Sequence, residues 1–360
     1  MFISEEKFKM NDLETMLAQH FGKKFCCFTG SGTTSIYLIL KALNLQHKKV
    51  LYPSISCMVP VNAALYSGYE VVFCDVNLKD YTMDLNAFKN TIDNYDIGVV
   101  VPTHIYGHKC NIKEISKIAH EKGIFVLEDA AQTISLSDES DASIMSFGHT
   151  KILETENGGG AIFIDDENLY NKLKKEKLTL PIKPENLNKL FDEYRQKYYS
   201  IMKNEDKNIN KYKEIFDLQL SSKEAFIYNL YDNEEIIEKI ECIKNIKDER
   251  NKRTKLYEKC LDETFIDKAK KNYDALWRYS FLYKGNREEL LKKVREKRID
   301  ISSWYPALHK FYSNQNDDEF PNAKIIEEKI INLWVNEGYS EEKILKNIKI
   351  INSIMRTIDN

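Results

Sequence analysis

Short apolar runs alternate with helical patterns between residues 25 and 164, and no other feature of the sequence constrains the fold as strongly. Apolar strands that alternate with helices are typical of a largely parallel sheet covered by helices on both faces. Ligands of such sheets bind beyond the carboxyl ends of the strands. We therefore predict an α/β fold with its site along that edge. The predicted strands span residues 25–28, 50–52, 70–75, 95–102, 124–128, 142–147 and 160–164, and the predicted helices span 33–43, 59–66 and 112–121.

The composition changes after about residue 180. Residues 183–215 are dense in Lys, Asn, Asp, Glu and Tyr, which predicts surface helices or an insertion. The remaining patterns predict a smaller α+β domain, with an amphipathic helix over 224–253, strands over 276–283 and 301–305, and helices over 287–297 and 341–355. We expect a large domain over residues 1–180, a variable helical connection over 181–223 and a small domain over 224–360.

The charge balance and the cysteines argue against several classes of protein. The formal net charge of −3 creates no overall positive field that would attract nucleic acid or an anionic membrane. The seven cysteines form no C-x-x-C pair, so neither a disulfide framework nor a zinc site is expected. The N-terminus is too polar for a signal peptide and no apolar run reaches membrane-spanning length, so we expect a cytoplasmic protein.

An acidic pair, Glu128 and Asp129, closes the apolar run at residues 124–127, and Lys151 follows among apolar and small residues. Burying a carboxylate or an ammonium group without a partner is costly. A pyridine-type cofactor offers a ring nitrogen to the acid and an aldehyde to the amine. Two alternatives stay open from these residues alone: Asp129 caps the following segment, or Lys151 is an ordinary surface lysine at the end of a strand.

The turn at residues 30–35, Gly-Ser-Gly-Thr-Thr-Ser, joins a predicted strand to a predicted helix. The N–H groups at the start of a helix attract anions. The turn is not a Walker A loop and lacks the third glycine of a dinucleotide fingerprint, so by itself an ordinary capped turn is the better interpretation. The order of this turn, a strand-end acid and Lys151 within one domain favours a phosphate-bearing cofactor. Ser146 is a second candidate for the phosphate.

Two histidines near the predicted edge, His104 and His149, are candidates for acid–base groups. Neither lies at a spacing that supports a metal, so no metal site is expected. Each is expected to be a hydrogen-bonded side chain of the site wall or the core.

Together these segments resemble the DegT/StrS-type sugar aminotransferases, pyridoxal-phosphate enzymes of the aspartate aminotransferase fold (fold type I). The likeness covers most of residues 13–165 and, more loosely, 216–355. It implies a large domain with a mostly parallel seven-stranded sheet and a small C-terminal α+β domain. The matching segments are Ser31–Thr34, Tyr52–Ser54, Val72–Val76, Val101–Gly107, Glu128–Gln132, Ser146-Phe147 with Lys151, Gly158–Gly160 and Ile301–His309.

The resemblance also implies roles for single residues. Lys151 would form a Schiff base with pyridoxal 5′-phosphate and shuttle a proton, and Asp129 would pair with the ring nitrogen. Gln132 would donate to the ring hydroxyl, and Cys57 would pack on the ring face. The implied phosphate residues are Ser31, Gly32, Thr33 and Ser146, and the implied substrate residues are His104, Tyr305 and His309.

Members of this family form homodimers with shared active sites. They usually move an amino group from glutamate to a keto group on a nucleotide-linked sugar. The present sequence departs from the pattern in three places: the N-terminal arm at residues 1–11 is nearly absent, Cys57 stands where an aromatic residue often lies, and Asp217-Leu218-Gln219 is the nearest counterpart of an Asn-x-Arg segment given by the partner subunit.

We therefore predict an aminotransferase whose acceptor is smaller than a nucleotide sugar, either a short phosphorylated ketone or a free keto-sugar. One alternative is a pyridoxal-phosphate enzyme that catalyses dehydration or decarboxylation. Lys151 argues against it, because related dehydratases carry histidine at that position. The other alternative is a non-catalytic member that binds a ligand or regulates transcription.

Overall fold

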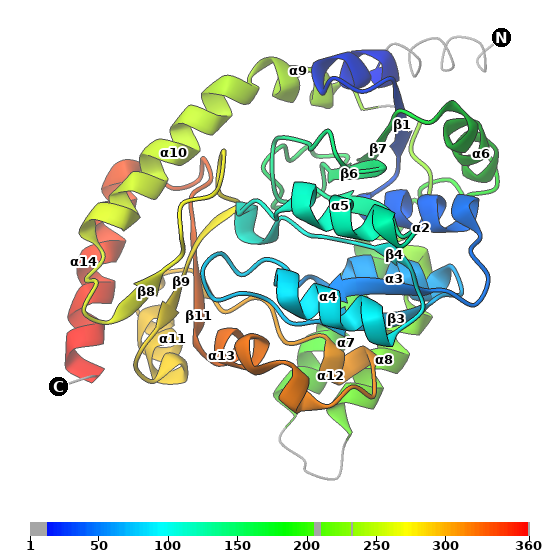
Figure 1. Ribbon diagram of the computed structural model, residues 1–360. Coiled ribbons are helices and arrows are strands. Elements are labelled where there is room, and N and C mark those ends of the chain that lie inside the picture. Colours follow the sequence, from blue (N-terminus) through cyan, green and yellow to red (C-terminus); the bar gives the residue numbers. More distant parts are fainter. Residues whose placement is uncertain (1–12, 205–209, 232, 359–360) are drawn as a thin grey trace.

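The computed structural model describes residues 13–204, 210–231 and 233–358. Its larger sheet has seven strands in the order β1-β7-β6-β5-β4-β2-β3 (Figure 1). Strand β7 runs antiparallel to β1 and β6, and the other neighbouring pairs are parallel, so the predicted α/β fold with a mostly parallel sheet is confirmed. The strands are β1 (Phe25–Thr29), β2 (Lys49–Pro53), β3 (Glu70–Cys74), β4 (Ile97–Val100), β5 (Phe125–Asp129), β6 (Ala142–Ser146) and β7 (Gly160–Ile164).

Helices cover both faces of this sheet. Side chains of a strand alternate between the two faces, so Leu51 of β2 packs with α4 and α5 while Val50 and Tyr52 pack with α2 and α3. Burial on both sides explains why the strands are continuously apolar rather than alternating. The helices are α2 (Gly32–Leu43), α3 (Met58–Tyr66), α4 (Leu85–Asn94), α5 (Ile112–Glu121) and α6 (Glu167–Lys177).

Helix α4 was not predicted, although a local signal for it exists. Asp84 is its N-cap and accepts hydrogen bonds from the N–H groups of Asn86 and Ala87, both at 2.9 Å. An aspartate in this position is a strong helix-start signal.

A smaller antiparallel sheet, ordered β10-β11-β9-β8, follows in the C-terminal part (Figure 1). A separate apolar cluster packs it against α10, α11 and α14. The predicted smaller α+β unit is therefore present. The elements of this C-terminal part of the chain are β8 (Ile266–Lys268), β9 (Arg278–Tyr283), β10 (Ile301–Ser302), β11 (Ile330–Trp334), α10 (Ile243–Cys260), α11 (Arg287–Glu296), α12 (His309–Tyr312), α13 (Pro321–Lys329) and α14 (Glu341–Ile358).

The predicted helix over residues 224–253 is wrong in its first part. Helix α9 begins at Glu235 and ends at Glu241, and α10 follows it. Residues 226–231 are not helical, because this segment lies against the start of α2. There the hydroxyls of Ser31 and Thr34 donate to the carbonyl oxygen of Phe226, at 2.8 and 3.1 Å. The Phe226 carbonyl oxygen thus has its partners on α2 rather than within a helix of its own.

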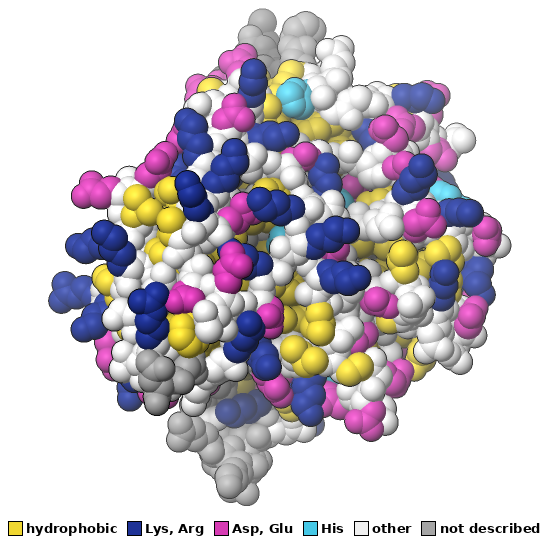
Figure 2. Space-filling view, turned by 60° about the vertical axis from the view of Figure 1, so that its left-hand side comes forward, with side chains coloured by type: hydrophobic (Ala, Val, Ile, Leu, Met, Phe, Trp, Pro, Cys, Tyr) yellow, Lys and Arg dark blue, Asp and Glu magenta, His cyan; other side chains and the backbone are white. Residues whose placement is uncertain are grey.

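The polar segment after residue 180 forms two packed helices, α7 (Leu187–Lys203) and α8 (Lys211–Ser221), next to α3 and α12 (Figure 1). Figure 2 shows Lys and Arg side chains interspersed with Asp and Glu on one face of the molecule. Within the described ranges, no helix combines the length and the apolar character needed to cross a membrane.

Candidate active site

A cavity of about 530 Å³ lies at the carboxyl ends of β1, β5 and β6. It gathers every residue that the sequence suggested for the cofactor, although these residues are spread over more than a hundred positions of the chain. The predicted residues that line it are Ser31, Gly32, Thr33, Cys57, Asp129, Gln132, Ser146 and Lys151.

Asp129 is the buried acid of this cavity. Its carboxyl group is at the end of β5, only 2% of the residue is exposed, and Oδ1 accepts the N–H of Ala131 at 3.0 Å. Burial raises the pKa of Asp129, whereas the Ala131 N–H and the charge of Lys151 act to lower it. No other donor within the described chain reaches the carboxyl group. The site therefore leaves one oxygen for a donor from a ligand, which a protonated ring nitrogen would satisfy.

The opposite end of the cavity suits an anion. Ser31 caps α2 by accepting the N–H of Thr34 at 3.0 Å, which leaves the first turn of a 12-residue helix facing the cavity. A Cβ atom on Gly32 would lie 3.0 Å from Cβ of Ser146, so glycine lets the Ser146 hydroxyl approach the helix start. The hydroxyl hydrogens of Thr33 and Ser146 have no acceptor among the described residues. Both can therefore donate to a phosphate.

Lys151 is in the loop between β6 and β7, and that loop is held from several sides. The N–H of Lys151 donates to Gly148 O at 3.1 Å, and the indole N–H of Trp277 donates to Thr150 O at 2.6 Å. Asn233 donates to Gly158 O at 2.6 Å. The ammonium group of Lys151 forms no ion pair in the described part of the chain. The fold thus holds the Lys151 amine at the cavity without an ion pair among the described residues.

Gln132 connects the cavity to the small sheet. Its Oε1 accepts the N–H of Tyr106 at 2.8 Å, which leaves Nε2 as a donor near Tyr305 Oη, 3.4 Å away. Tyr106 in turn accepts the N–H of Tyr305 at 3.0 Å. Gly107, at φ 96°, brings this turn so close to the start of β9 that a Cβ would lie 2.6 Å from the nitrogen of Trp277.

A second cavity of about 490 Å³ adjoins the first, and Cys57, Val59, His149 and Phe191 line both. Tyr305, one of the predicted substrate residues, lies here. Most of the other lining side chains were not predicted from the sequence, because they come from α7 and from three separate segments of the small sheet. The main ones are Tyr194, Arg195, Tyr198, Tyr199, Trp277, Arg278, Asp300, Ser302, Trp304 and Trp334.

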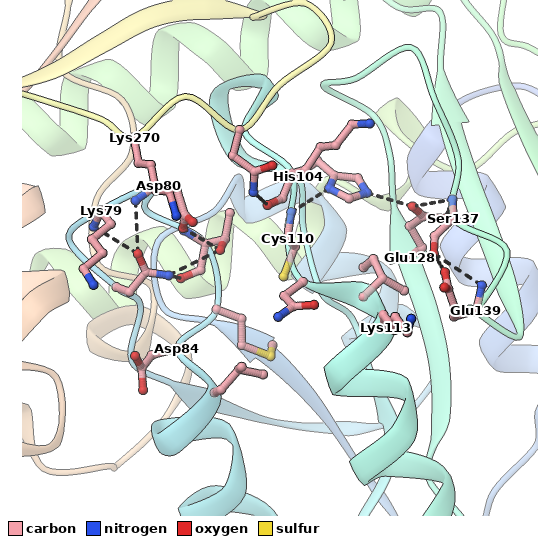
Figure 3. Close-up of a pocket in the computed structure, with 18 of the residues that line it drawn as sticks. Lys79, Asp80, Asp84, His104, Cys110, Lys113, Glu128, Ser137, Glu139 and Lys270 are labelled. Atoms are coloured by element: carbon pink, nitrogen blue, oxygen red, sulfur yellow. Dashed lines mark hydrogen bonds and ion pairs between the residues drawn. The ribbon is translucent and has the colours of Figure 1, made fainter.

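His104 faces a different pocket, of about 980 Å³, on the other side of β5 (Figure 3). Its ring bridges Glu128 Oε1, at 2.7 Å, and the N–H of Cys110, at 2.9 Å. Burial acts to raise the pKa of Glu128, but hydrogen bonds from His104, Ser143 and Ser137 outweigh it and lower the pKa. Glu128 and Asp129, which are adjacent in β5, thus face pockets on opposite sides of the strand.

Two further residues lie apart from both cavities. His309 is held between Ser54 Oγ and Asp317 Oδ1, each at 2.7 Å, and its ring is stacked on Phe320. Gln219, part of the nearest counterpart of the Asn-x-Arg segment, is buried and accepts from Asn62 at 2.5 Å. No group of three or more metal-ligating side chains occurs within residues 13–204, 210–231 and 233–358. The N-terminal arm at residues 1–11 lies outside the described residues.

Comparison with known proteins agrees with this geometry. Residues 4–352 match the model of the DegT/DnrJ/EryC1/StrS aminotransferase family. The chain belongs to this family. Two enzymes named for their reactions match part of it. UDP-4-amino-4,6-dideoxy-N-acetyl-beta-L-altrosamine transaminase of Campylobacter jejuni is 28% identical over 46% of this chain and 46% of its own length. 3-Oxo-glucose-6-phosphate:glutamate aminotransferase of Bacillus subtilis is 30% identical over 45% of this chain and 38% of its own. The chain spans less than half the length of each of these two relatives.

Solved structures confirm the fold over almost the whole chain. An aminotransferase of the same family from Brucella abortus has a TM-score of 0.75 at 20% identity, covering 96% of this chain and 90% of its own. A Bacillus subtilis protein solved with bound cofactor PMP has a TM-score of 0.73 at 19% identity, covering 97% and 77%. The predicted fold of this aminotransferase family, with its large and small sheets, is therefore correct.

Proposed function

We propose that the protein is a pyridoxal-phosphate-dependent aminotransferase that transfers an amino group from an amino acid, with glutamate as the expected donor, to the carbonyl of a keto-sugar or small phosphorylated keto compound. One observation carries the proposal: a lysine without an ion pair among the described residues, a buried carboxyl with one oxygen not bonded by them and a capped helix start line a single cavity of about 530 Å³. Membership of the aminotransferase family and the two named relatives support it.

In this proposal each end of the cavity holds one part of the cofactor. Asp129 would keep a proton on the ring nitrogen, Gln132 would donate its amide N–H to the ring oxygen, and Cys57 would pack on the ring. Burial raises the pKa of the Cys57 thiol, so the thiol stays neutral and offers an apolar contact. The phosphate is held by Ser31, Gly32, Thr33 and Ser146. When bound, pyridoxal 5′-phosphate supplies an electron-withdrawing ring that stabilises negative charge on the adjoining substrate carbon.

Lys151 is the acid–base group of the proposed reaction. Its amine would take a proton from the substrate carbon and return one to C4′ of the cofactor. Such acid–base roles contribute rate factors of roughly 10²–10⁴ in enzymes. The ammonium has no ion pair within the described ranges, so no salt bridge must break before it acts. A histidine would lack the reach and nucleophilicity of this primary amine, which favours amino transfer over dehydration.

Three finer parts of the proposal concern the setting. Tyr305 borders the substrate, because it lies where the two cavities meet. The working unit is a homodimer, the arrangement that the family resemblance implies. The compartment is the cytoplasm, in keeping with seven cysteines that are all free in the described structure.

The test uses full-length protein, pyridoxal 5′-phosphate and glutamate labelled with ¹⁵N at its amino group. Keto-sugars, keto-sugar phosphates and nucleotide-linked keto-sugars are offered as acceptors, and mass spectrometry follows the label. We expect the label in an amino sugar, together with an equal amount of 2-oxoglutarate. If no labelled amine forms from glutamate with any of these acceptors, although the cofactor is bound, the proposed reaction is wrong. Turnover of nucleotide-linked sugars alone would refute the smaller acceptor.

A further inference from the structure

The second cavity contains a buried cation that forms no ion pair with any residue the structure describes. Arg278 is at the start of β9 and is only 5% exposed. Its guanidinium carbon is 4.5 Å from the ring centre of Trp277 and 3.6 Å from that of Trp334, so the group is sandwiched between two indoles. Its only hydrogen bond in the described chain runs from Nη1 to Ser302 Oγ, at 2.6 Å. The buried Nε atom of Arg278 has no hydrogen-bond acceptor among the described residues.

No carboxylate in the described ranges forms an ion pair with Arg278. Asp300, which lines the same cavity, instead accepts the indole N–H of Trp334 at 2.5 Å. Burial lowers the pKa of Arg278, but an arginine still stays protonated at neutral pH. A buried charge is costly unless it is paired. The charge of Asp300 acts on Arg278 from within the cavity, but the groups in direct contact with the guanidinium are neutral rings and one serine hydroxyl.

A neighbouring arginine shows how the fold treats a purely structural guanidinium. Arg250 is also 5% exposed and also lies beside the start of β9. Its Nη1 donates to the carbonyl oxygens of Leu276 and Trp277, at 3.0 and 3.3 Å. Arg250 therefore anchors backbone, whereas Arg278 leaves the Nε–Nη2 edge without acceptors and lines a cavity. That edge carries two parallel donors, the arrangement that binds an oxyanion through two hydrogen bonds.

We propose that Arg278 is the receptor for an oxyanion of the substrate, a carboxylate or a phosphate group, in the cavity next to Lys151. The proposal rests on the proposed function only in calling the bound molecule a substrate of amino transfer. According to the proposal, the donor or the acceptor carries a carboxylate or phosphate group and is small enough for a cavity of about 490 Å³. Trp277 and Trp334 hold the guanidinium plane, and Ser302 fixes its rotation, so Arg278 offers a preformed fork.

The chain carries its own reporter for this site. All three tryptophans, Trp277, Trp304 and Trp334, line the cavity, so intrinsic fluorescence reports on it without any turnover. Full-length protein is titrated with glutarate, glucose 6-phosphate, inorganic phosphate and glucose. The series is repeated after saturation with pyridoxal 5′-phosphate, which removes anion binding at the phosphate end of the first cavity. We expect a saturable change with at least one anion in both series and none with glucose.

Three variants test the assignment to Arg278. In Arg278→Met we expect the affinity for the anion to fall about 10- to 100-fold, the range of a hydrogen bond to a charged group. Arg278→Lys keeps the charge without the fork and is expected to restore part of the loss, which also covers the case in which the methionine variant misfolds. Arg195, on the rim of the same cavity, is 53% exposed at its side chain, so Arg195→Met is expected to change affinity less than about three-fold.

The outcomes separate the possible sources of the oxyanion. A response to glutarate but not to glucose 6-phosphate assigns Arg278 to the carboxylate of an amino donor, and the reverse assigns it to the phosphate of an acceptor. An unchanged affinity in folded Arg278→Met, an equal loss in Arg195→Met, or the absence of any saturable anion response would overturn the proposal. Anion binding without amino transfer would refute the proposed function and leave the receptor in place.

Discussion

The two adjoining cavities are built in different ways. The cofactor cavity is framed mainly by the strand ends and loops of the large sheet, between residues 31 and 158, and its key groups are an acid, an amine and hydroxyls. The second cavity, here called the aromatic cavity, is closed by α7 and by three segments of the small sheet. Its key groups are aromatic rings around Arg278. Cys57, Val59, His149 and Phe191 form the shared wall.

This difference separates chemistry from selectivity. The first cavity offers partners for every polar part of one cofactor, which leaves little freedom in what it can hold. The second offers broad apolar contacts and one arginine, so under the two proposals it would select substrates by size and by an anionic group. If this division is correct, substitutions in the first cavity should lower the rate for every substrate, and substitutions in the second should change which substrate is used.

Lys151→Ala should have the largest effect. We expect amino transfer to fall by at least about 10³-fold with every donor and acceptor, because the acid–base group is removed. Lys183 is the matched control, since it lines the same cavity but donates to Asn157 O at 3.1 Å. Steady-state kinetics of Lys151→Ala and Lys183→Ala measure the difference in turnover. Substantial turnover in Lys151→Ala would place the reactive amine elsewhere.

Asp129→Asn should lower turnover roughly 10²–10³-fold, the range found when one preorganised electrostatic partner is lost. Its neighbour Glu128 is the control, because Glu128 faces the other pocket (Figure 3). Glu128→Gln should leave the cofactor affinity unchanged but lower the free energy of unfolding by about 1–3 kcal/mol, since it weakens buried hydrogen bonds. Equal losses of turnover in the two variants would contradict the separation of the two sides of β5.

Asp129→Asn should also change how the stability of the cofactor-free protein depends on pH. Burial raises the pKa of Asp129 above its unfolded value, so the native state holds its proton more tightly. This contribution is fully present below the unfolded pKa and is lost as pH rises from there through the folded pKa. Asp129→Asn should therefore unfold at a higher temperature than the wild type at neutral pH, with no such gain below about pH 4. A gain that grows as pH falls would contradict the sign.

Gly32→Ala should weaken cofactor binding at the phosphate end. The added Cβ would lie 3.0 Å from Cβ of Ser146, closer than normal packing allows. Overpacking of this kind costs typically about 1–3 kcal/mol, which corresponds to roughly a 5- to 150-fold loss of affinity. In Gly148→Ala the nearest contact is 3.7 Å, so this variant serves as the control. Titration of cofactor-free protein with pyridoxal 5′-phosphate measures both.

Tyr199→Ala should give the smallest effect and the most selective one. Tyr199 is on α7, and its ring centre is 6.4 Å from that of Trp304 in the aromatic cavity. Loss of such a ring pair costs about 0.5–1.5 kcal/mol. We therefore expect KM for the acceptor to rise a few-fold, while the reaction with the amino donor is unchanged. A loss of kcat with all substrates would mean that α7 supports the chemistry itself.

The sequence predicted the first cavity well because its residues follow strands. Asp129 and Ser146 end strands whose apolar runs are visible, and parallel strands bring such ends to one edge. The second cavity could not be predicted in this way. Arg278 is buried only because Trp277 and Trp334 arrive from different strands, and the α7 aromatics occur in a segment that reads as polar surface. His104 shows the opposite error: a motif residue near the right edge faces away from the cofactor cavity.

The central claim is that one cavity fixes the cofactor on Lys151. The direct test is to load the protein with pyridoxal 5′-phosphate, reduce it with borohydride, digest it and locate the modified lysine by mass spectrometry. Wild type and Lys183→Ala should carry the label on Lys151, and Lys151→Ala should carry none there or elsewhere in the cavity. Label on another lysine of folded wild-type protein, or no stable label at all, would contradict the account.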